Sequence, residues 1–179
     1  MENFVFKEYL ETERLLLRAW LESDAAALYK YASDAAVANP AGWPVHESEL
    51  MSLAVIQTVF SAPGTYAVVL KESGEAVGCC GIVPPEARPN VKTCLGEVEI
   101  GYWIGRAHWG RGLIPEAVDA LVEHCFGDLR ARRAWISCFA FNAKSRRVAE
   151  KCGFAFDHSE RQGDIEELFF VKENENYGY

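Results

Sequence analysis

The 179-residue sequence lacks several features that would point to a specialised class of protein. No apolar run approaches the roughly 20 residues that a membrane-spanning helix needs, so we expect no contact with a membrane. The four histidines, His46, His108, His124 and His158, are scattered without ligand-like spacing, which argues against a metal site. Basic residues are scarce. Eighteen Lys and Arg stand against 26 Asp and Glu, and the net charge of −8 disfavours direct binding to nucleic acid.

The cysteines give no sign of a disulfide framework. None of the six forms a C-x-x-C pair, and the adjacent Cys79 and Cys80 are awkward partners for a disulfide. The acidic start, MENFVFKEYLETERL, does not resemble a signal peptide. Together these features predict reduced cysteines and a cytoplasmic location.

The sequence contains ample material for a folded core. Half of its residues are hydrophobic, and they include five Trp, seven Tyr and ten Phe. Its length suits one domain, and no repeat, low-complexity block or linker divides it. We therefore expect a single domain over residues 1–179, with a core at about residues 12–172 and a polar C-terminal tail.

Short β-rich runs and helical spacing alternate along the chain. Strands are expected at Arg14–Trp20, as a hairpin over Thr65–Val83, at Glu97–Ile104, at Arg132–Phe141, and in the final runs FAFDHSE and IEELFFVK. Helices are expected from a cap at Ser23 or Asp24, toward Phe60, after Leu113, and from Asn142 to a stop at Gly153. Asn39–Leu50, with two prolines and a glycine, is expected to interrupt regular structure. This order indicates an α+β fold with one parallel strand pair across a right-handed crossover.

One stretch, YWIGRAHWGRGLIPEAV, joins a predicted strand to a predicted helix. It contains no G-x-x-x-x-G-K-[ST] pattern, and the G-x-G-x-x-G that begins at Gly110 meets Pro115 in place of its third glycine. Gly110 and Gly112 tolerate backbone angles closed to other residues, and Pro115 suits a first helical turn. The amides of residues 110–114 are therefore expected to converge on an anion, with Arg111 adding charge. A plain strand-to-helix turn is the alternative.

The ordered motifs resemble the GNAT superfamily of N-acetyltransferases, and within it the branch of ribosomal-protein N-terminal acetyltransferases. Five segments carry the resemblance: TERLLLR (12–18), GWPVH (42–46), EIGYWI (99–104), WGRGL (109–113) with Glu116 and Ala117 after it, and NAKSRRVAEKCGF (142–154). They span roughly residues 12–170 in the expected order. Each segment is a weak signal alone, whereas the ordered combination is specific.

The resemblance implies a GNAT-type fold, in which helices flank a central, mostly antiparallel twisted sheet with one splayed parallel pair. Here that pair would be Glu97–Ile104 and Ala134–Phe141, and the cosubstrate acetyl-CoA would bind in the opening between them. The family uses the matching glycine loop to bind pyrophosphate through backbone amides. The implied cofactor-binding residues are Tyr102, Trp103, Ile104, Trp109, Gly110, Arg111, Gly112, Leu113 and Asn142. For Asn142, a role as helix N-cap alone is the alternative.

The implied activity is direct transfer of an acetyl group to a primary amine in a ternary complex. Such a reaction needs a group that accepts the proton of the amine, and Glu99 is the leading candidate. Glu97 would share its strand face and is assigned to the substrate site. The alternative is that one or both carboxylates face solvent. Glu160, Asp164 and Glu166 near the last hairpin are reserve candidates.

The departing thiolate needs a proton donor. Many members have a tyrosine where this chain has Ala149, whereas the ribosomal-protein branch often has a serine at the position of Ser145. Ser145 is therefore expected to be the general acid, directly or through water. A backbone hydrogen bond in the first helical turn is its alternative role. Ala149 also motivates a different function, a catalytically inactive module that binds acetyl-CoA.

The acceptor is expected to be a protein N-terminus or a small amine. Trp43 and His46 would line its site together with the final hairpin. Specificity resides in loops that vary within a shared fold, so these residue types do not identify the amine. A nucleotide-binding protein is a further alternative function, and a monomer and a homodimer are both compatible with the sequence.

Overall fold

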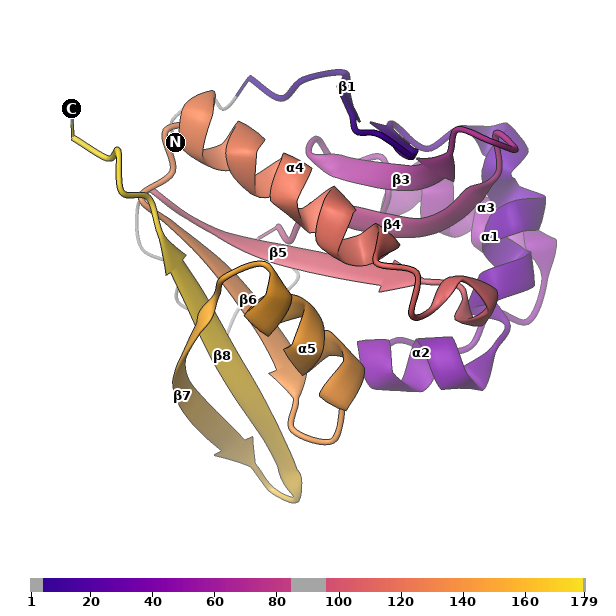
Figure 1. Cartoon of the computed structure of the whole chain (residues 1–179). Coiled ribbons are helices and arrows are strands. Elements are labelled where there is room, and N and C mark those ends of the chain that lie inside the picture. Colours follow the sequence, from indigo (N-terminus) through magenta and orange to yellow (C-terminus); the bar gives the residue numbers. More distant parts are fainter. Residues whose placement is uncertain (1–4, 85–95, 179) are drawn as a thin grey trace.

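The computed structural model describes residues 5–84 and 96–178, and one eight-stranded sheet organises them (Figure 1). The strands are β1 (Tyr9–Glu11), β2 (Leu15–Arg18), β3 (Thr65–Leu70), β4 (Ala76–Ile82), β5 (Glu97–Ile104), β6 (Arg133–Phe139), β7 (Ala155–Gln162) and β8 (Ile165–Glu173). The helices are α1 (Ala25–Ala32), α2 (Ala35–Ala41), α3 (Glu49–Thr58), α4 (Leu113–Gly127) and α5 (Ala143–Lys151). Across the sheet the strand order is β1-β2-β3-β4-β5-β6-β8-β7.

The sheet is antiparallel except at one place. β5 and β6 run parallel, and their pairing covers only Glu97–Glu99 against Arg133–Trp135. Beyond these residues the two strands spread apart, as Figure 1 shows. The predicted fold class, an α+β sheet with one splayed parallel pair, is therefore confirmed.

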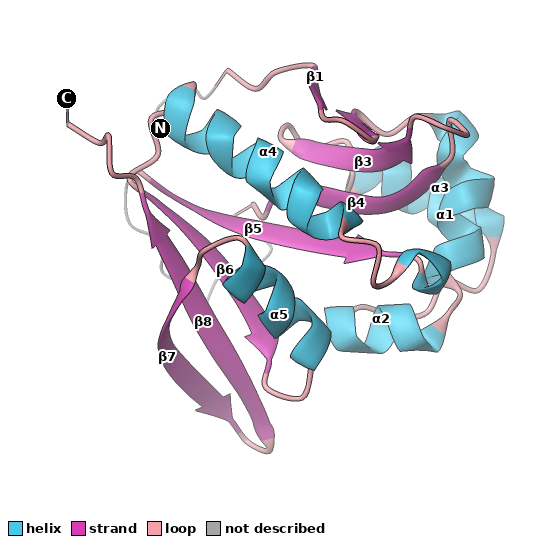
Figure 2. Ribbon diagram, in the orientation of Figure 1, coloured by secondary structure: helices cyan, strands magenta, loops and turns pink. Residues whose placement is uncertain are grey.

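Helices lie on both faces of the sheet. In Figure 2, α4 and α5 lie in front of the sheet, whereas α1 and α3 lie behind β3 and β4. We call these sides the α4 face and the α1 face. Successive strand residues point to opposite faces. In β6 the buried Ala134, Ile136 and Cys138 therefore face α5, and Trp135 and Ser137 face the other way.

The expected interruption at Asn39–Leu50 is wrong at both ends, because Asn39–Ala41 belong to helix α2 and Glu49 and Leu50 belong to helix α3. The Asp34 side chain caps this helix by accepting a hydrogen bond from the Ala36 amide. Pro40 has no N–H, so this seven-residue helix lacks the hydrogen bond that residue 40 would donate to the Ala36 carbonyl oxygen. Gly42 then ends the helix in the left-handed region, at φ 79°.

Two further local expectations need correction. Strand β1 has only three residues and was not predicted from the sequence pattern. Asp24 stands at the start of α1 but makes no capping bond to that helix. Its carboxylate instead accepts hydrogen bonds from the Arg18 guanidinium and from the Leu21 amide, so it ties β2 to the turn before α1.

The described cysteines are buried and unpaired. Cys138 and Cys152 are 7% and 3% exposed, so both belong to the core. Cys94 and most of the proline-rich connection before β5 lie outside the described residues. None of the described helices combines the length and the apolar character that crossing a membrane requires.

Candidate functional site

A cavity of about 1000 Å³ opens where β5 and β6 separate. Residues of both sheet faces line it. Tyr102 and Cys138 lie on the α4 face, and Glu99 and Ser137 lie on the α1 face. The cavity therefore passes through the sheet, and two molecules that enter from opposite faces can meet inside it.

Most of the predicted site residues line this cavity. They are Trp43, His46, Glu99, Tyr102, Trp103, Ile104, Trp109, Gly110, Gly112, Leu113, Asn142 and Ser145. Glu97 and Arg111 do not line it.

The glycine loop forms the end of the cavity next to α4. Gly110 and Gly112 both have left-handed backbones, with φ of 75° and 74°, which a side chain disfavours. Gly112 is the N-cap of α4, and Pro115 lies in its first turn as expected. Within the described part of the chain, the amides of residues 110–114 donate no hydrogen bond to other protein groups. A helix start with unpaired amides is a site where anions bind well.

Contacts from the turn between β1 and β2 hold this loop in place. The Arg14 guanidinium donates to the Arg111 carbonyl oxygen at 2.9 Å and pairs with Glu116 in the first turn of α4. The Glu116 carboxylate also accepts from the Arg14 amide and from Thr12. Burial alone would raise the pKa of Glu116, but these hydrogen bonds outweigh it and lower the pKa. Glu116 therefore remains an anion that anchors the helix start.

The side chain of Arg111 has a structural role on the outside of the loop. Its guanidinium lies 3.3 Å from His108 Nδ1 and 3.4 Å from Glu72. His108 in turn lies 3.1 Å from the Tyr31 hydroxyl. Burial, and then Arg111, lower the pKa of His108, so the imidazole is neutral near pH 7. The positive charge of Arg111 therefore lies beside the loop, at His108 and Glu72, and outside the cavity.

A row of basic side chains on α5 was missed by the sequence reasoning. Lys144, Arg147 and Lys151 all line the cavity. Their spacing of three and four residues places them along one helix face, and this signal was present in NAKSRRVAEK. The Lys144 ammonium also lies 4.0 Å from the centre of the Trp109 ring. The α4 side of the cavity is therefore cationic.

Tyr102 and Ser145 place two hydroxyls side by side in the cavity wall. The Tyr102 hydroxyl lies 2.9 Å from Ser145 Oγ and donates to the Ser145 carbonyl oxygen at 3.1 Å. Burial raises the pKa of Tyr102, so the phenol stays protonated. The buried Ala149 lies one turn further along the same face of α5.

Asn142 fixes this end of α5. Its Oδ1 accepts a hydrogen bond from the Ser145 amide at 3.2 Å, which confirms the predicted N-cap. Its Nδ2 donates to the Pro40 carbonyl oxygen at 3.1 Å. The loop between β6 and α5 is therefore tied to the end of α2 across the cavity.

Glu99 is the buried carboxylate of the α1 face. It is 5% exposed and accepts a hydrogen bond from the Ser137 hydroxyl at 2.7 Å. Glu167 on β8 also lines the cavity and pairs in register with Phe139 of β6. The reserve candidates Glu160, Asp164 and Glu166 are absent from the lining. For Glu166 alternation along β8 explains this, because Glu166 and Glu167 point to opposite faces.

Trp43 and His46 lie close together on the same side. Their rings are 5.5 Å apart, and Trp43 also packs edge-on against Trp103 at 5.8 Å. His46 Nδ1 lies 2.8 Å from the Ser52 hydroxyl. Burial lowers the pKa of His46, so its ring is neutral near pH 7. These aromatic rings make the floor of the cavity apolar.

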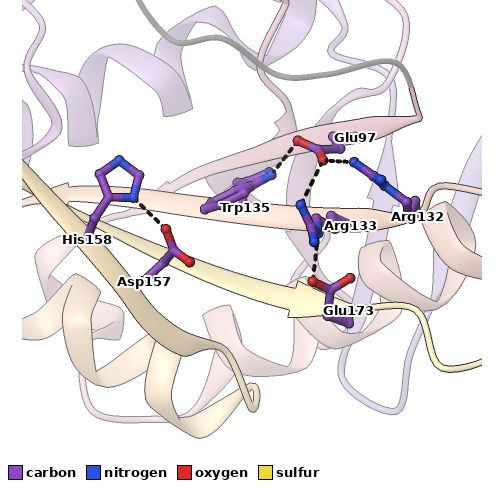
Figure 3. A network of polar contacts seen from close by, with 7 residues as sticks. All are labelled: Glu97, Arg132, Arg133, Trp135, Asp157, His158 and Glu173. Atoms are coloured by element: carbon purple, nitrogen blue, oxygen red, sulfur yellow. Dashed lines mark hydrogen bonds and ion pairs between the residues drawn. The ribbon is translucent and has the colours of Figure 1, made fainter.

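Glu97 lies on the same strand face as Glu99, as expected, but in a separate polar network (Figure 3). Its carboxylate accepts from Arg132, Arg133 and the Trp135 indole nitrogen. Arg133 also pairs with Glu173 at 2.6 Å. This network links β5 and β6 at the end where the two strands pair, so Glu97 stabilises the sheet and lies outside the cavity. Among the described residues, no cluster of three or more His, Cys, Asp and Glu could hold a metal ion.

Comparisons with known proteins agree on one family. Residues 14–155 match the family model described as an acetyltransferase (GNAT) domain. An uncharacterized N-acetyltransferase, p20, from Bacillus licheniformis is 28% identical over 172 residues, or 90% of this chain and 93% of that protein. The ribosomal-protein-serine acetyltransferase of Escherichia coli is 36% identical over 67 residues, 37% of each chain.

Among solved structures, a GNAT-family acetyltransferase from Bacillus anthracis superposes with a TM-score of 0.78 at 22% identity. The match covers 94% of this chain and 99% of that one. At this identity the likeness concerns the fold. The segment matched by the family model contains every lining residue of the cavity except Glu167.

Proposed function

The chain belongs to the GNAT family of acetyltransferases, and from this premise we propose that it transfers an acetyl group from acetyl-CoA directly to a primary amine. The observation that carries the proposal is the cavity through the sheet. It has unpaired helix-start amides and basic side chains on one face, and a buried carboxylate on the other. Such a cavity suits a ternary complex, in which both substrates are bound before the acetyl group moves.

The α4 side of the cavity fits the donor, acetyl-CoA. The unpaired amides of residues 110–114 suit a pyrophosphate. Lys144, Arg147 and Lys151 add positive charge for the phosphates along α5. Strand β5, where it spreads from β6, offers the side chains of Tyr102 and Ile104 and the backbone of Trp103 to the pantetheine arm. Asn142 acts as both helix cap and cavity wall.

On the α1 side, Glu99 is the proposed general base. A protonated amine cannot attack a thioester, so its proton must pass to a protein group or to water. Glu99 accepts the proton, directly or through a water molecule, and the Ser137 hydroxyl holds its carboxylate in place. Trp43 and His46 contribute the apolar wall that orients the acceptor.

On the α4 side, the Ser145 and Tyr102 hydroxyls donate to the sulfur as the thioester bond breaks. The Tyr102 and Ser145 hydroxyl oxygens lie 2.9 Å apart. We propose that this pair of hydroxyls supplies the proton donor that the chain lacks at Ala149. Burial keeps the Tyr102 phenol protonated, so it remains a donor near neutral pH. The inactive-module alternative, motivated by Ala149, therefore loses its main chemical argument.

We propose a protein N-terminus as the acceptor, and small amines as the second candidate class. The name of the Escherichia coli relative, a ribosomal-protein-serine acetyltransferase, supports the first. The carboxylates Glu99 and Glu167 on the acceptor side favour a cationic molecule such as an ammonium.

The proposal is tested by measuring free CoA thiol with a panel of N-terminal peptides and small amines. We expect amine-dependent thiol release, and we expect Glu99→Gln to lower kcat by about 10²- to 10⁴-fold. Glu97→Gln is the matched control and should leave kcat near the wild-type value, because Glu97 lies outside the cavity. No amine-dependent release with any acceptor would leave the inactive-module function standing. Equal rates for wild type and Glu99→Gln would remove only the assignment of the base.

A further inference from the structure

Two stacked phenylalanines stand at the end of β6. The rings of Phe139 and Phe141 have centres 5.3 Å apart and an interplanar angle of 21°. Phe139 lines the cavity, whereas Phe141 is 69% exposed. The pair thus extends the apolar cavity wall out to the protein surface.

The pair lies on the acceptor side. Alternation along β6 places Phe139 on the same face as Ser137, the partner of Glu99. Phe139 is in register with Glu167, and it packs against the end of α2, where a Cβ added to Gly42 would lie 3.3 Å from the ring.

The bond from Asn142 to the Pro40 carbonyl holds the loop that carries Phe141. An exposed ring on an anchored loop loses little conformational freedom when a ligand covers it. The aromatic pair is therefore a preformed surface rather than a mobile side chain.

We propose that Phe139 and Phe141 form a subsite for an apolar, preferably aromatic, side chain at the second or third residue of a peptide acceptor. This rests on the proposed function, because it assumes that the N-terminal amine lies at Glu99 and Ser137. Phe139 is two residues beyond Ser137, or about 6.6 Å along the strand. An extended peptide covers roughly 3.3–3.6 Å per residue, so its second and third residues reach the pair.

The chemistry of this subsite selects one class of acceptor. A ring stacked on Phe141 covers apolar surface that otherwise faces water, and aromatic pairs prefer such offset or edge contacts. An acceptor with only polar residues near its amine gains nothing there. Phe139 and Phe141 thus act as specificity residues and do not touch the transferred acetyl group.

The test uses synthetic peptides that differ at one position. Each carries a free N-terminal serine and an otherwise Ser/Gly sequence, with a single phenylalanine at position 2, 3 or 5, or none. Wild type should show kcat/KM about tenfold higher for phenylalanine at position 2 or 3 than for the peptide without it. Phenylalanine at position 5 should give no such gain, because it lies beyond the pair.

Phe141→Ser should remove this preference and change kcat/KM for the all-polar peptide by less than about twofold. Phe156→Ser is the matched control, since Phe156 is 59% exposed on β7 and packs on Phe170, away from the cavity. It should keep the preference.

Equal kcat/KM for all peptides in wild type, or an equal loss with every peptide in Phe141→Ser, would overturn the subsite. The wild-type series decides this even if the variant does not fold. The proposed function would survive either result, because amine-dependent thiol release would still occur. No release with any peptide or small amine would overturn both proposals.

Discussion

At the scale of single residues, the proposed role of the Tyr102 and Ser145 hydroxyls can be tested by removing each hydroxyl in turn. We expect Tyr102→Phe and Ser145→Ala each to lower kcat by at least about tenfold and to change the KM for acetyl-CoA by less than about twofold. The reason is that both hydroxyls act on the sulfur only as the thioester bond breaks. Steady-state kinetics with saturating acceptor would measure both values.

Tyr66→Phe is the matched control for this pair. Tyr66 is buried, and its hydroxyl donates to the Lys7 carbonyl oxygen at 2.7 Å, outside the cavity. Removing either phenol hydroxyl should lower the free energy of unfolding by about 1 kcal/mol. Only Tyr102→Phe should lower kcat. If the two variants lose kcat equally, Tyr102 has a structural role alone.

The pKa of Tyr102 adds a pH criterion to the same measurement. Burial raises it above the ordinary value of about 10, so the phenol is protonated throughout the range from pH 6 to 9. The ratio of wild-type to Tyr102→Phe kcat should therefore be constant over that range. A ratio that falls toward pH 9 would mean that the phenol ionises during the assay.

Two neighbouring carboxylates show what a single strand pattern leaves undecided. Alternation predicts that Glu97 and Glu99 share a face, and they do. Their different roles depend on what the next strand brings beside each: Arg133 and Trp135 contact Glu97, and Ser137 contacts Glu99. Those partners lie more than 30 residues away, so no local pattern in β5 separates an ion-pair residue from a candidate base.

At the scale of elements, the glycine loop can be tested by replacing one hydrogen with a methyl group. Gly110→Ala should raise the Kd for acetyl-CoA by about tenfold or more. Gly110 lines the cavity, so a Cβ there would stand where the ligand approaches. No atom of the described residues lies within 4 Å of a Cβ at Gly110, so packing is not disturbed. The left-handed backbone alone should cost about 1–2 kcal/mol of stability. Titration calorimetry and thermal unfolding would measure the two effects.

Gly74→Ala separates strain from binding. Gly74 has φ of 72°, and its Cβ would also meet no atom within 4 Å, but it lies in the β3–β4 turn outside the cavity. It should lose similar stability and keep the wild-type Kd. Similar affinity losses in both variants would mean that the loop acts through stability and not as an anion site.

The elements were predicted unevenly, for physical reasons. Four elements follow strong local signals. Strand alternation marks the β3–β4 hairpin and β5, Pro115 marks the start of α4, and the Asn142 cap marks the start of α5. Helix α2 was missed because Pro40 is a strong breaker signal, although in this short helix it removes only the one hydrogen bond to the Ala36 carbonyl oxygen. The spacing of Lys144, Arg147 and Lys151 in the sequence indicates one basic face of α5. Only the position of α5 beside the cavity shows that this face lines the cavity.

At the scale of the whole molecule, the family and the fold were predictable because five weak motifs occur in a specific order. The passage through the sheet was implied by the resemblance and depends on where the pairing of β5 with β6 stops, after Glu99 and Trp135. The aromatic pair at its mouth had no sequence signal. In the sequence, Phe139 and Phe141 look like ordinary strand residues. Their role depends on where β6 ends, at Phe139, and on the hydrogen bond to α2 that anchors the following loop.

We expect a ligand that fills the whole cavity to stabilise the protein more than one that binds the glycine loop alone. The size of the stabilisation therefore distinguishes a CoA site from a nucleotide site. CoA at 100 times its Kd should stabilise the fold by about 2.7 kcal/mol. For a chain of this size that raises Tm by about 5 to 10 °C in a calorimetric scan. ADP at the same concentration should raise Tm by less than half as much. It carries a pyrophosphate for the amides of residues 110–114, but it lacks an arm to lie between β5 and β6. A shift from ADP equal to that from CoA would mean that the loop alone binds the ligand, and the chain would then be a nucleotide-binding protein on an acetyltransferase fold.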